Sequence, residues 1–208
     1  MNWTTISALA TGLGTLVLAI ATFAAVRSAN RSARVAERSL LAGLRPLLVS
    51  SRFEDPVQKV GFADGKWLAV PGGQAVAEAG DEAVWLAISI RNVGTGIAVL
   101  HGWHLETERP DASRAPDVDS FTRLTRDLYI APGDVGFWQG TFRDPSRPEF
   151  AAAKQAVETR GTLIVYVLYG DYEGGQRIVS RFALVAREGD GWISSVGRHW
   201  SIDGPAPR

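Results

Sequence analysis

The feature that most constrains this chain is a stretch with no charged side chain, from residue 2 to residue 26. Its central part, Thr5–Val26, contains only apolar, small or hydroxylated residues over 22 positions. As a helix it would be about 33 Å long, close to the roughly 30 Å hydrocarbon core of a bilayer. Trp3 stands where an interfacial aromatic anchor is expected. We therefore predict a transmembrane helix over residues 1–26.

Two alternatives to a retained anchor fit the sequence less well. A core helix of a soluble protein seldom stays uncharged on every face for six turns. A cleaved signal usually has a basic residue before its apolar core, whereas the first basic residue here is Arg27. The small residues of Ala19–Ala21 and Phe23–Ala25 still offer sites to a signal peptidase. Cleavage therefore stays open beside the favoured anchor.

The net charge is zero, but the charges are distributed unevenly along the chain, and this distribution predicts how the chain is oriented in the membrane. Residues 1–45 hold five arginines and one glutamate, a net charge of +4, and the remainder carries −4. Because basic residues tend to stay in the cytoplasm, we expect the N-terminus outside and the C-terminal domain in the cytoplasm. The acidic domain argues against a nucleic-acid partner, and the absence of cysteine excludes disulfides and zinc-thiolate sites. Four arginines are expected at the membrane surface together with the aromatic anchor: Arg27, Arg31, Arg34 and Arg38.

The helix is expected to continue beyond the bilayer as a basic juxtamembrane helix over residues 27–45. Small residues recur along it at the three- and four-residue spacing of a helix–helix contact. The residues of this predicted contact are Ala21, Ala25, Ala29, Ala33 and Ala36. Two partners are possible: a second copy of the helix, or the anionic headgroups of the lipid bilayer, to which each arginine would add about 1 kcal/mol near the surface.

Residues 46–203 are predicted to form one mainly β domain, followed by a flexible tail over residues 204–208. Pro46 ends the helix, and alternation of apolar and polar residues then dominates. The favoured fold is an immunoglobulin-like antiparallel β-sandwich with one short helix, and a small closed barrel is the alternative. The predicted strands are a hairpin around Asp64–Gly65 and the segments 47–53, 84–91, 97–106, 127–130, 135–142, 163–169, 178–186 and 192–202.

The single helix of this domain is predicted from a capping pattern. Ser146 and Glu149 have the spacing of a capping box. An apolar stripe follows, formed by Phe150, Ala153 and Val157. The pattern predicts a helix that packs one face on the β domain.

Three turn motifs resemble those of a loose group of uncharacterised bacterial single-pass membrane proteins with a C-terminal β domain. The motifs are "NVGTG" from Asn92 to Gly96, "PG" at Pro132–Gly133, and the hairpin "YGDYEG" from Tyr169 to Gly174. Members of that group often carry proline after the second glycine, where this chain has Ile97. The resemblance implies the anchor-plus-β-domain architecture and implies no activity.

No residue pattern indicates a catalytic, cofactor or metal site. His101 and His104 lie three apart on a predicted strand and so face opposite sides, with His101 expected in the core. No Gly-x-Ser-x-Gly elbow is present. Trp85 and Trp138 are expected on solvent-side faces of their strands, where paired aromatics can mark a binding surface.

These observations favour a non-enzymatic, membrane-anchored interaction module whose β domain contacts a protein partner at the cytoplasmic face. The alternative is an effector or transport accessory that acts on the membrane and self-associates through its N-terminal helix. An enzyme is the least supported interpretation, because it would need a pocket of convergent polar groups that no motif here predicts.

Overall fold

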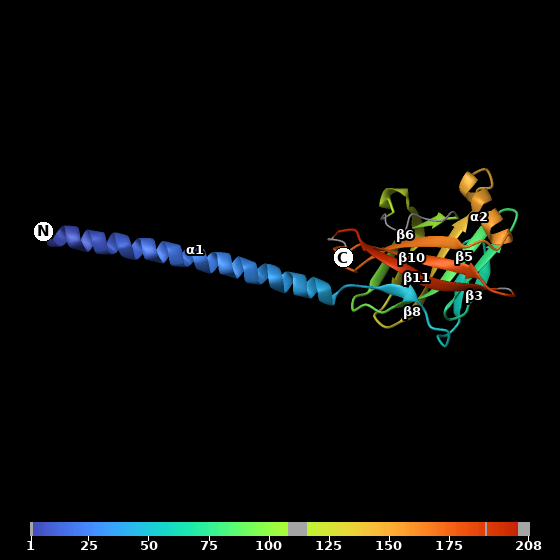
Figure 1. Ribbon diagram of the computed structural model, residues 1–208, viewed down its shortest axis with the longest axis horizontal. Coiled ribbons are helices and arrows are strands. Elements are labelled where there is room, and N and C mark those ends of the chain that lie inside the picture. The colour runs from blue at the N-terminus through green and yellow to red at the C-terminus, as the bar shows by residue number, and fades with distance from the viewer. Residues whose placement is uncertain (1, 108–115, 190, 204–208) are drawn as a thin grey trace. The chain divides into compact units, whose positions relative to one another are not determined.

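The computed structural model describes residues 2–107, 116–189 and 191–203, with all their side chains except those of Thr4, Thr5, Arg38, Leu41, Ala42 and Thr125. Its backbone is drawn in Figure 1. The chain divides into two compact units, residues 1–43 and residues 44–208.

The first unit is one uninterrupted helix, α1 (Trp3–Gly43), of 41 residues. No proline interrupts it, and its final residue is the glycine at which a helix commonly ends. Within it, Ile6–Glu37 is long and apolar enough to cross a membrane, and none of that span is buried inside the chain. A core helix would be buried, so the structure supports a helix suited to lipid and confirms the predicted continuation beyond residue 26.

The second unit holds eleven strands, a single turn of 3-10 helix and one further α-helix among its described residues. The 3-10 turn is η1 (Val118–Ser120) and the helix is α2 (Pro148–Glu158). The strands are β1 (Leu48–Ser50), β2 (Gln58–Gly61), β3 (Trp67–Val70), β4 (Gln74–Ala79), β5 (Val84–Asn92), β6 (Ala98–Glu106), β7 (Thr122–Ile130), β8 (Val135–Phe142), β9 (Leu163–Gly170), β10 (Ile178–Ala186) and β11 (Trp192–Ser201).

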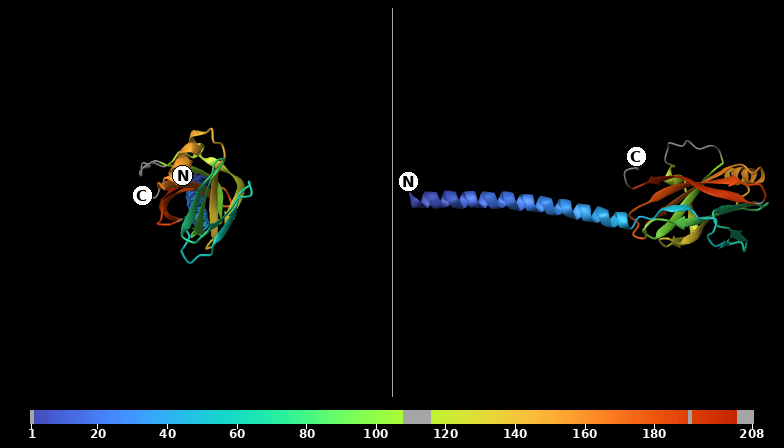
Figure 2. Two further views of the ribbon diagram at one scale, coloured as in Figure 1. Left: turned by 90° about the vertical axis from the view of Figure 1, so that its right-hand side faces the viewer. Right: turned by 60° about the horizontal axis from the view of Figure 1, so that its bottom comes forward.

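Nine strands form one antiparallel sheet, which curls round on itself (Figure 2). The order runs β7-β6-β9-β10-β11-β4-β5-β8, and β1 pairs with the last three residues of β5 beside β4. Only two residue pairs join β4 to β11, Ala75 with Trp192 and Gln74 with Ile193. β2 and β3 form a separate two-stranded ribbon around a turn in which Gly65 has φ +82°.

The structure confirms a mainly β domain but does not confirm an immunoglobulin-like sandwich. A sandwich has two separate sheets, whereas here the β4–β11 pairing makes one continuous curled sheet. The bounds of β8 and β10 agree with the predicted ones. β7 begins at Thr122, five residues before the predicted start, because its first half has little apolar alternation for the sequence to reveal.

The main core lies inside the curl, and α2 packs against it through Phe150 and Ala153. The predicted stripe is therefore confirmed. The predicted capping box is wrong: Arg147 is the N-cap and makes no side-chain capping bond. Ser146 instead donates its hydroxyl to Asp144 at 2.5 Å, so the hydroxyl that would cap the helix is used in the preceding turn.

A second core cluster lies on the outer face of β4, β5 and β8, under the β2–β3 ribbon. Trp85 packs there and donates its indole N–H to Asp64 at 2.8 Å. Trp138 faces the main core and is fully buried. The prediction of a solvent-facing side chain is wrong for Trp138, because the curl encloses it. Trp85 does lie on the outer face, but the β2–β3 ribbon of the same chain leaves it half-buried.

Candidate functional site

The turn that follows β5 forms hydrogen bonds with the first residues of the β domain, residues 44–47. Asn92, the last residue of β5, is fully buried. Its side-chain oxygen accepts the backbone N–H groups of Leu47 at 3.1 Å and Gly94 at 3.0 Å. Its amide nitrogen donates to the carbonyl oxygens of Gly96 at 2.7 Å and Ile130 at 3.0 Å. One side chain thus joins three separate segments and leaves none of its own hydrogen-bonding capacity unused.

Backbone contacts complete this clamp, which we define as residues 92–96 holding residues 44–47. The carbonyl oxygen of Arg45 accepts the N–H groups of Thr95 at 3.0 Å and Gly96 at 3.4 Å. A Cβ atom at Gly94 would lie 2.4 Å from that same oxygen, which no side chain could tolerate. The predicted strand-to-strand turn is confirmed, but no sequence pattern indicates that its glycines accommodate residues 44–47.

A buried polar line lies next to the clamp, on β9, β10 and β11. The backbone N–H of Leu48 donates to the Tyr169 hydroxyl at 3.1 Å, and that hydroxyl lies 2.8 Å from the Ser180 hydroxyl. Ser180 in turn lies 2.6 Å from Nδ1 of His199. Burial and the nearby positive charge of Arg45 lower the pKa of His199, which favours the neutral ring that can accept from Ser180.

The Ser180–His199 pair has the spacing of a nucleophile and its base, and sequence reasoning missed it. Ser180 is fully buried and its oxygen also contacts the Tyr169 hydroxyl, whose pKa burial raises. A nucleophile must reach a substrate, whereas this hydroxyl is fully buried in the domain. The line joins β1 to the sheet through the Tyr169 hydroxyl.

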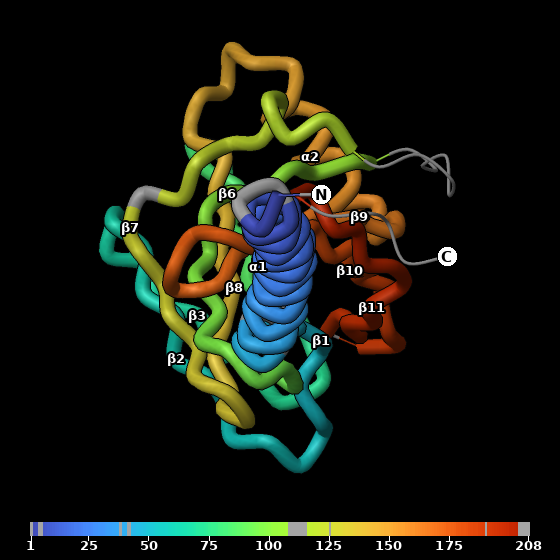
Figure 3. Tube along the Cα trace, turned by 90° about the vertical axis from the view of Figure 1, so that its left-hand side faces the viewer, coloured from blue at the N-terminus to red at the C-terminus, as the bar shows by residue number. Residues whose placement is uncertain are grey.

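An open seam separates β7 from β8, and both strands are labelled in Figure 3. The two strands follow each other through the turn at Pro132–Gly133, where Gly133 has φ +79°. Such neighbours normally pair as a hairpin. Instead β7 pairs with β6 and β8 pairs with β5, and no ladder joins the two in the part of the chain that the structure describes. Each strand therefore presents one edge to the seam.

The side chain of Ile130 packs against the start of β8 at the turn. A Cβ atom on Gly136 would lie 2.8 Å from the side chain of Ile130, so that side chain occupies the space beside the start of β8. Ile130 is buried in the main core. After the turn the two strands join different partners, because β7 pairs with β6 and β8 pairs with β5.

The seam contains a cavity of about 70 Å³ whose walls come from both strands. Trp103 of β6 lines it and is only 3% exposed; its ring meets Trp138 and Phe142 edge to face at 5.3 and 5.1 Å. The cavity is lined by Ala63, Trp103, Thr122, Arg123, Leu124, Arg126, Leu128, Gln139, Gly140, Thr141 and Arg143. Three arginines and no carboxylate are in that set, so the cavity favours an anion.

Arg126 crosses the seam. It lies on β7 between Leu124 and Leu128, which pack against the main core. Its guanidinium donates to the side chain of Gln139 on β8 at 2.7 Å and to the carbonyl of Gly61 at 3.2 Å. These contacts are exposed to solvent, so they hold the seam weakly.

A second, larger cavity of about 680 Å³ continues the seam toward the start of α2. It shares Trp103, Thr122, Thr141 and Arg143 with the first cavity. Its charged lining is mixed, because Arg147 stands 3.6 Å from Asp144 in an exposed ion pair. The positive character is thus concentrated in the middle of the seam.

The predicted membrane-surface residues lie on α1. Trp3 is 84% exposed, and Arg27, Arg31 and Arg34 are exposed; the Arg38 side chain lies outside the described residues. At 100° per residue the arginines share one face of the helix. The predicted contact residues lie mainly on the opposite face and are all exposed: Ala21, Ala25, Ala29, Ala33 and Ala36. The membrane-surface role and the helix-contact role both stay predictions. The predicted tail over residues 204–208 lies outside the described residues.

The prediction that His101 lies in the core is wrong, because its side chain is exposed. A β-bulge between Leu100 and Gly102 shifts the alternation of β6 and turns the histidine outward while Trp103 stays inward. Among the described residues, no group of three or more metal-ligating side chains comes together.

The chain was compared with family models, curated proteins and solved structures, and none of them matches it.

Proposed function

We propose that this chain is a membrane-anchored binding module, whose helix α1 fixes it in a bilayer and whose β domain binds a protein partner. The observation that carries the proposal is the open seam, a break in an otherwise paired sheet that is lined by arginines. Unpaired strand edges are a common means of protein recognition.

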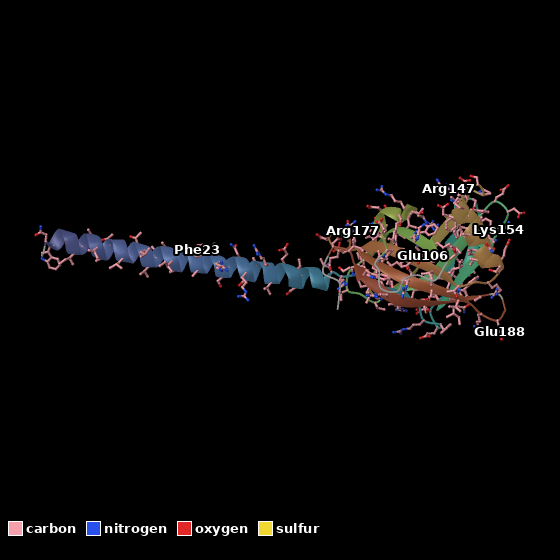
Figure 4. All side chains as sticks on the ribbon, turned by 45° about the horizontal axis from the view of Figure 1, so that its top comes forward. Phe23, Glu106, Arg147, Lys154, Arg177 and Glu188 are labelled. Carbon is pink, nitrogen blue, oxygen red and sulfur yellow. The ribbon has the colours of Figure 1, made fainter. Side chains whose placement is uncertain are left out.

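The anchor is supported by the character of α1. Its apolar side chains are exposed along the whole span Ile6–Glu37 and need an apolar surrounding. Phe23, which Figure 4 labels on this helix, is 70% exposed. The arginines that follow the apolar part support a cytoplasmic domain, because translocating them is costly.

The clamp supports a β domain that begins directly after α1. Residues 44–47 are bound to the turn 92–96 through both their backbone and the Asn92 side chain, so the first residues after the helix belong to the folded domain. A partner bound by the domain would be recruited to the membrane that holds α1.

The proposal is tested by locating the two ends of the chain relative to the membrane. The protein has no cysteine, so Asn2→Cys and Glu188→Cys each introduce one reporter; both positions are exposed, and Figure 4 shows Glu188. We expect a membrane-impermeant maleimide to label Asn2→Cys in intact cells and Glu188→Cys only after lysis. Labelling of Glu188→Cys in intact cells would overturn the orientation, and release of the chain into the medium would overturn the anchor.

A second function, self-association through α1, is favoured because small residues and arginines occupy different faces of this helix. The small residues and the arginines lie mainly on opposite sides, so two helices could approach through the alanines while the arginines remain solvated. In this alternative the assembled helices act on the membrane and the β domain is an accessory.

A further inference from the structure

We infer that the seam between β7 and β8 binds an extended, acidic segment of a partner protein, which adds to the sheet as a strand. The inference rests on the proposed binding function and specifies its site and the chemistry of its partner. It follows from three properties of the seam: its free backbone edges, its charge and its apolar floor.

The backbone edges require an extended ligand. β7 is paired on its β6 side alone and β8 on its β5 side alone within the described chain. An extended segment that runs beside these edges would pair with their backbone groups as a further strand of the sheet. A helix satisfies its own backbone groups and would leave these edges unpaired.

The charge requires an acidic ligand. Arg123, Arg126 and Arg143 line the middle cavity without a carboxylate among the lining residues. The nearest acidic partner is Asp64, whose carboxylate lies 3.6 Å from Arg143 and also accepts the indole N–H of Trp85. It offsets one of the three positive charges and leaves the site basic.

The apolar side chains at the base of the seam favour a ligand in which apolar and acidic residues alternate. Successive side chains of a strand point to opposite faces. One set would point toward Trp103, whose buried ring lines the cavity together with Leu124 and Leu128 and offers apolar contacts. The other set would point outward, where the exposed Arg123 is available to carboxylates. The preferred segment therefore alternates apolar and acidic residues.

Arg126 must be displaced when such a segment enters. Its bonds to Gln139 and Gly61 occupy the crossing point of the seam. Because both bonds are exposed, exchanging them for a carboxylate of the ligand costs little. The same arginine thus closes the empty seam and can bind the incoming strand.

The binding test uses the full chain in detergent micelles and a fluorescent peptide of about eight residues that alternates valine and glutamate. We expect the anisotropy to report saturable binding, and hydrogen exchange to show new protection in β7 and β8. A valine–lysine peptide should not bind, and a central proline, which lacks a backbone donor, should weaken binding.

Charge-reversal variants locate the site. Arg123→Glu should weaken binding of the valine–glutamate peptide by roughly tenfold or more, whereas Arg187→Glu, an exposed arginine after β10, should leave it unchanged. Equal binding by both variants, equal binding of acidic and basic peptides, or no binding of the acidic peptide would overturn the inference.

Crosslinking in cells separates this inference from the proposed function. A photoreactive residue would replace Thr141 in the seam or Val185, which is 46% exposed on β10. Protein adducts at Thr141 and not at Val185 are expected. Adducts at Val185 alone would leave a binding module but reject the seam, and adducts at neither position would reject the proposed function itself.

Discussion

Gly96 lies so close to Leu44 that a Cβ atom on the glycine would stand 1.7 Å from the carbonyl oxygen of Leu44. The contact joins the turn after β5 to the first residues of the β domain. It also explains why the turn has glycine there although no positive φ demands it.

The first prediction concerns this contact. Gly96→Ala should open the clamp and lower the free energy of unfolding of the β domain, because backbone must move to admit the methyl group. We expect a loss of about 1–3 kcal/mol by urea denaturation. Gly191→Ala is the matched control, since its Cβ would find its nearest neighbour at 3.6 Å. Equal stability of the two variants would contradict the clamp.

The second prediction concerns the buried polar line. Tyr169→Phe removes the hydroxyl that accepts from Leu48 and contacts Ser180. Because both partners would then be buried without it, the variant should lose about 1–3 kcal/mol of stability. Tyr172→Phe, at a position 72% exposed, should change nothing measurable. The comparison is a pair of urea unfolding curves, and a stable Tyr169→Phe variant would show that the line contributes little.

The third prediction concerns pH. Burial and Arg45 lower the pKa of His199 below its unfolded value of about 6.5. The unfolded chain therefore binds a proton that the folded chain resists, so stability should fall as the pH decreases from about 6.5 toward the folded pKa. Above that pH range the histidine is neutral in both the folded and the unfolded chain, so it does not make stability depend on pH.

The variant His199→Gln should flatten this dependence in part. The pKa of His101 is lowered as well, first by partial desolvation of its exposed ring where it meets Gly170 and then by Arg177, so a residual slope in the same direction is expected. The measurement is the urea midpoint of both proteins across this pH range. An unchanged slope in the variant would show that His199 does not carry the effect.

The fourth prediction tests self-association of α1. Ala25→Leu or Ala29→Leu should abolish crosslinked dimers in membranes if the small-residue face forms the contact, because bulk there keeps the backbones apart. Ala24→Leu introduces the same side chain about 140° away from Ala29 and should leave the dimers intact. Loss of dimers in all three variants would point to a general effect on the helix.

Some of the architecture could be read from local patterns. The uncharged stretch predicted a membrane-compatible helix, which is present as α1. The period-2 runs predicted β8 and β10 at their observed bounds, and Asp64–Gly65 predicted the β2–β3 turn. Such features depend on neighbours within a few residues, so the sequence states them directly.

The candidate site could not be read in this way. Arg123 lies on β7 and Arg143 directly follows β8, two consecutive strands that normally would pair as a hairpin. Only the pairing of β7 with β6 and of β8 with β5 opens the seam that these arginines line. The outward turn of His101 depends on a bulge that no residue pattern announces.

What the sequence by itself determined is thus the anchor, the strands and the turns, because each follows from composition and periodicity over a short window. Tertiary structure decided which strands pair, what covers Trp85 and Trp138, and what the glycines of the Asn92–Gly96 turn accommodate. The physical reason is distance along the chain. Leu48 and Tyr169 meet in one hydrogen bond although 121 residues separate them, and such contacts are selected by the packing of the whole domain.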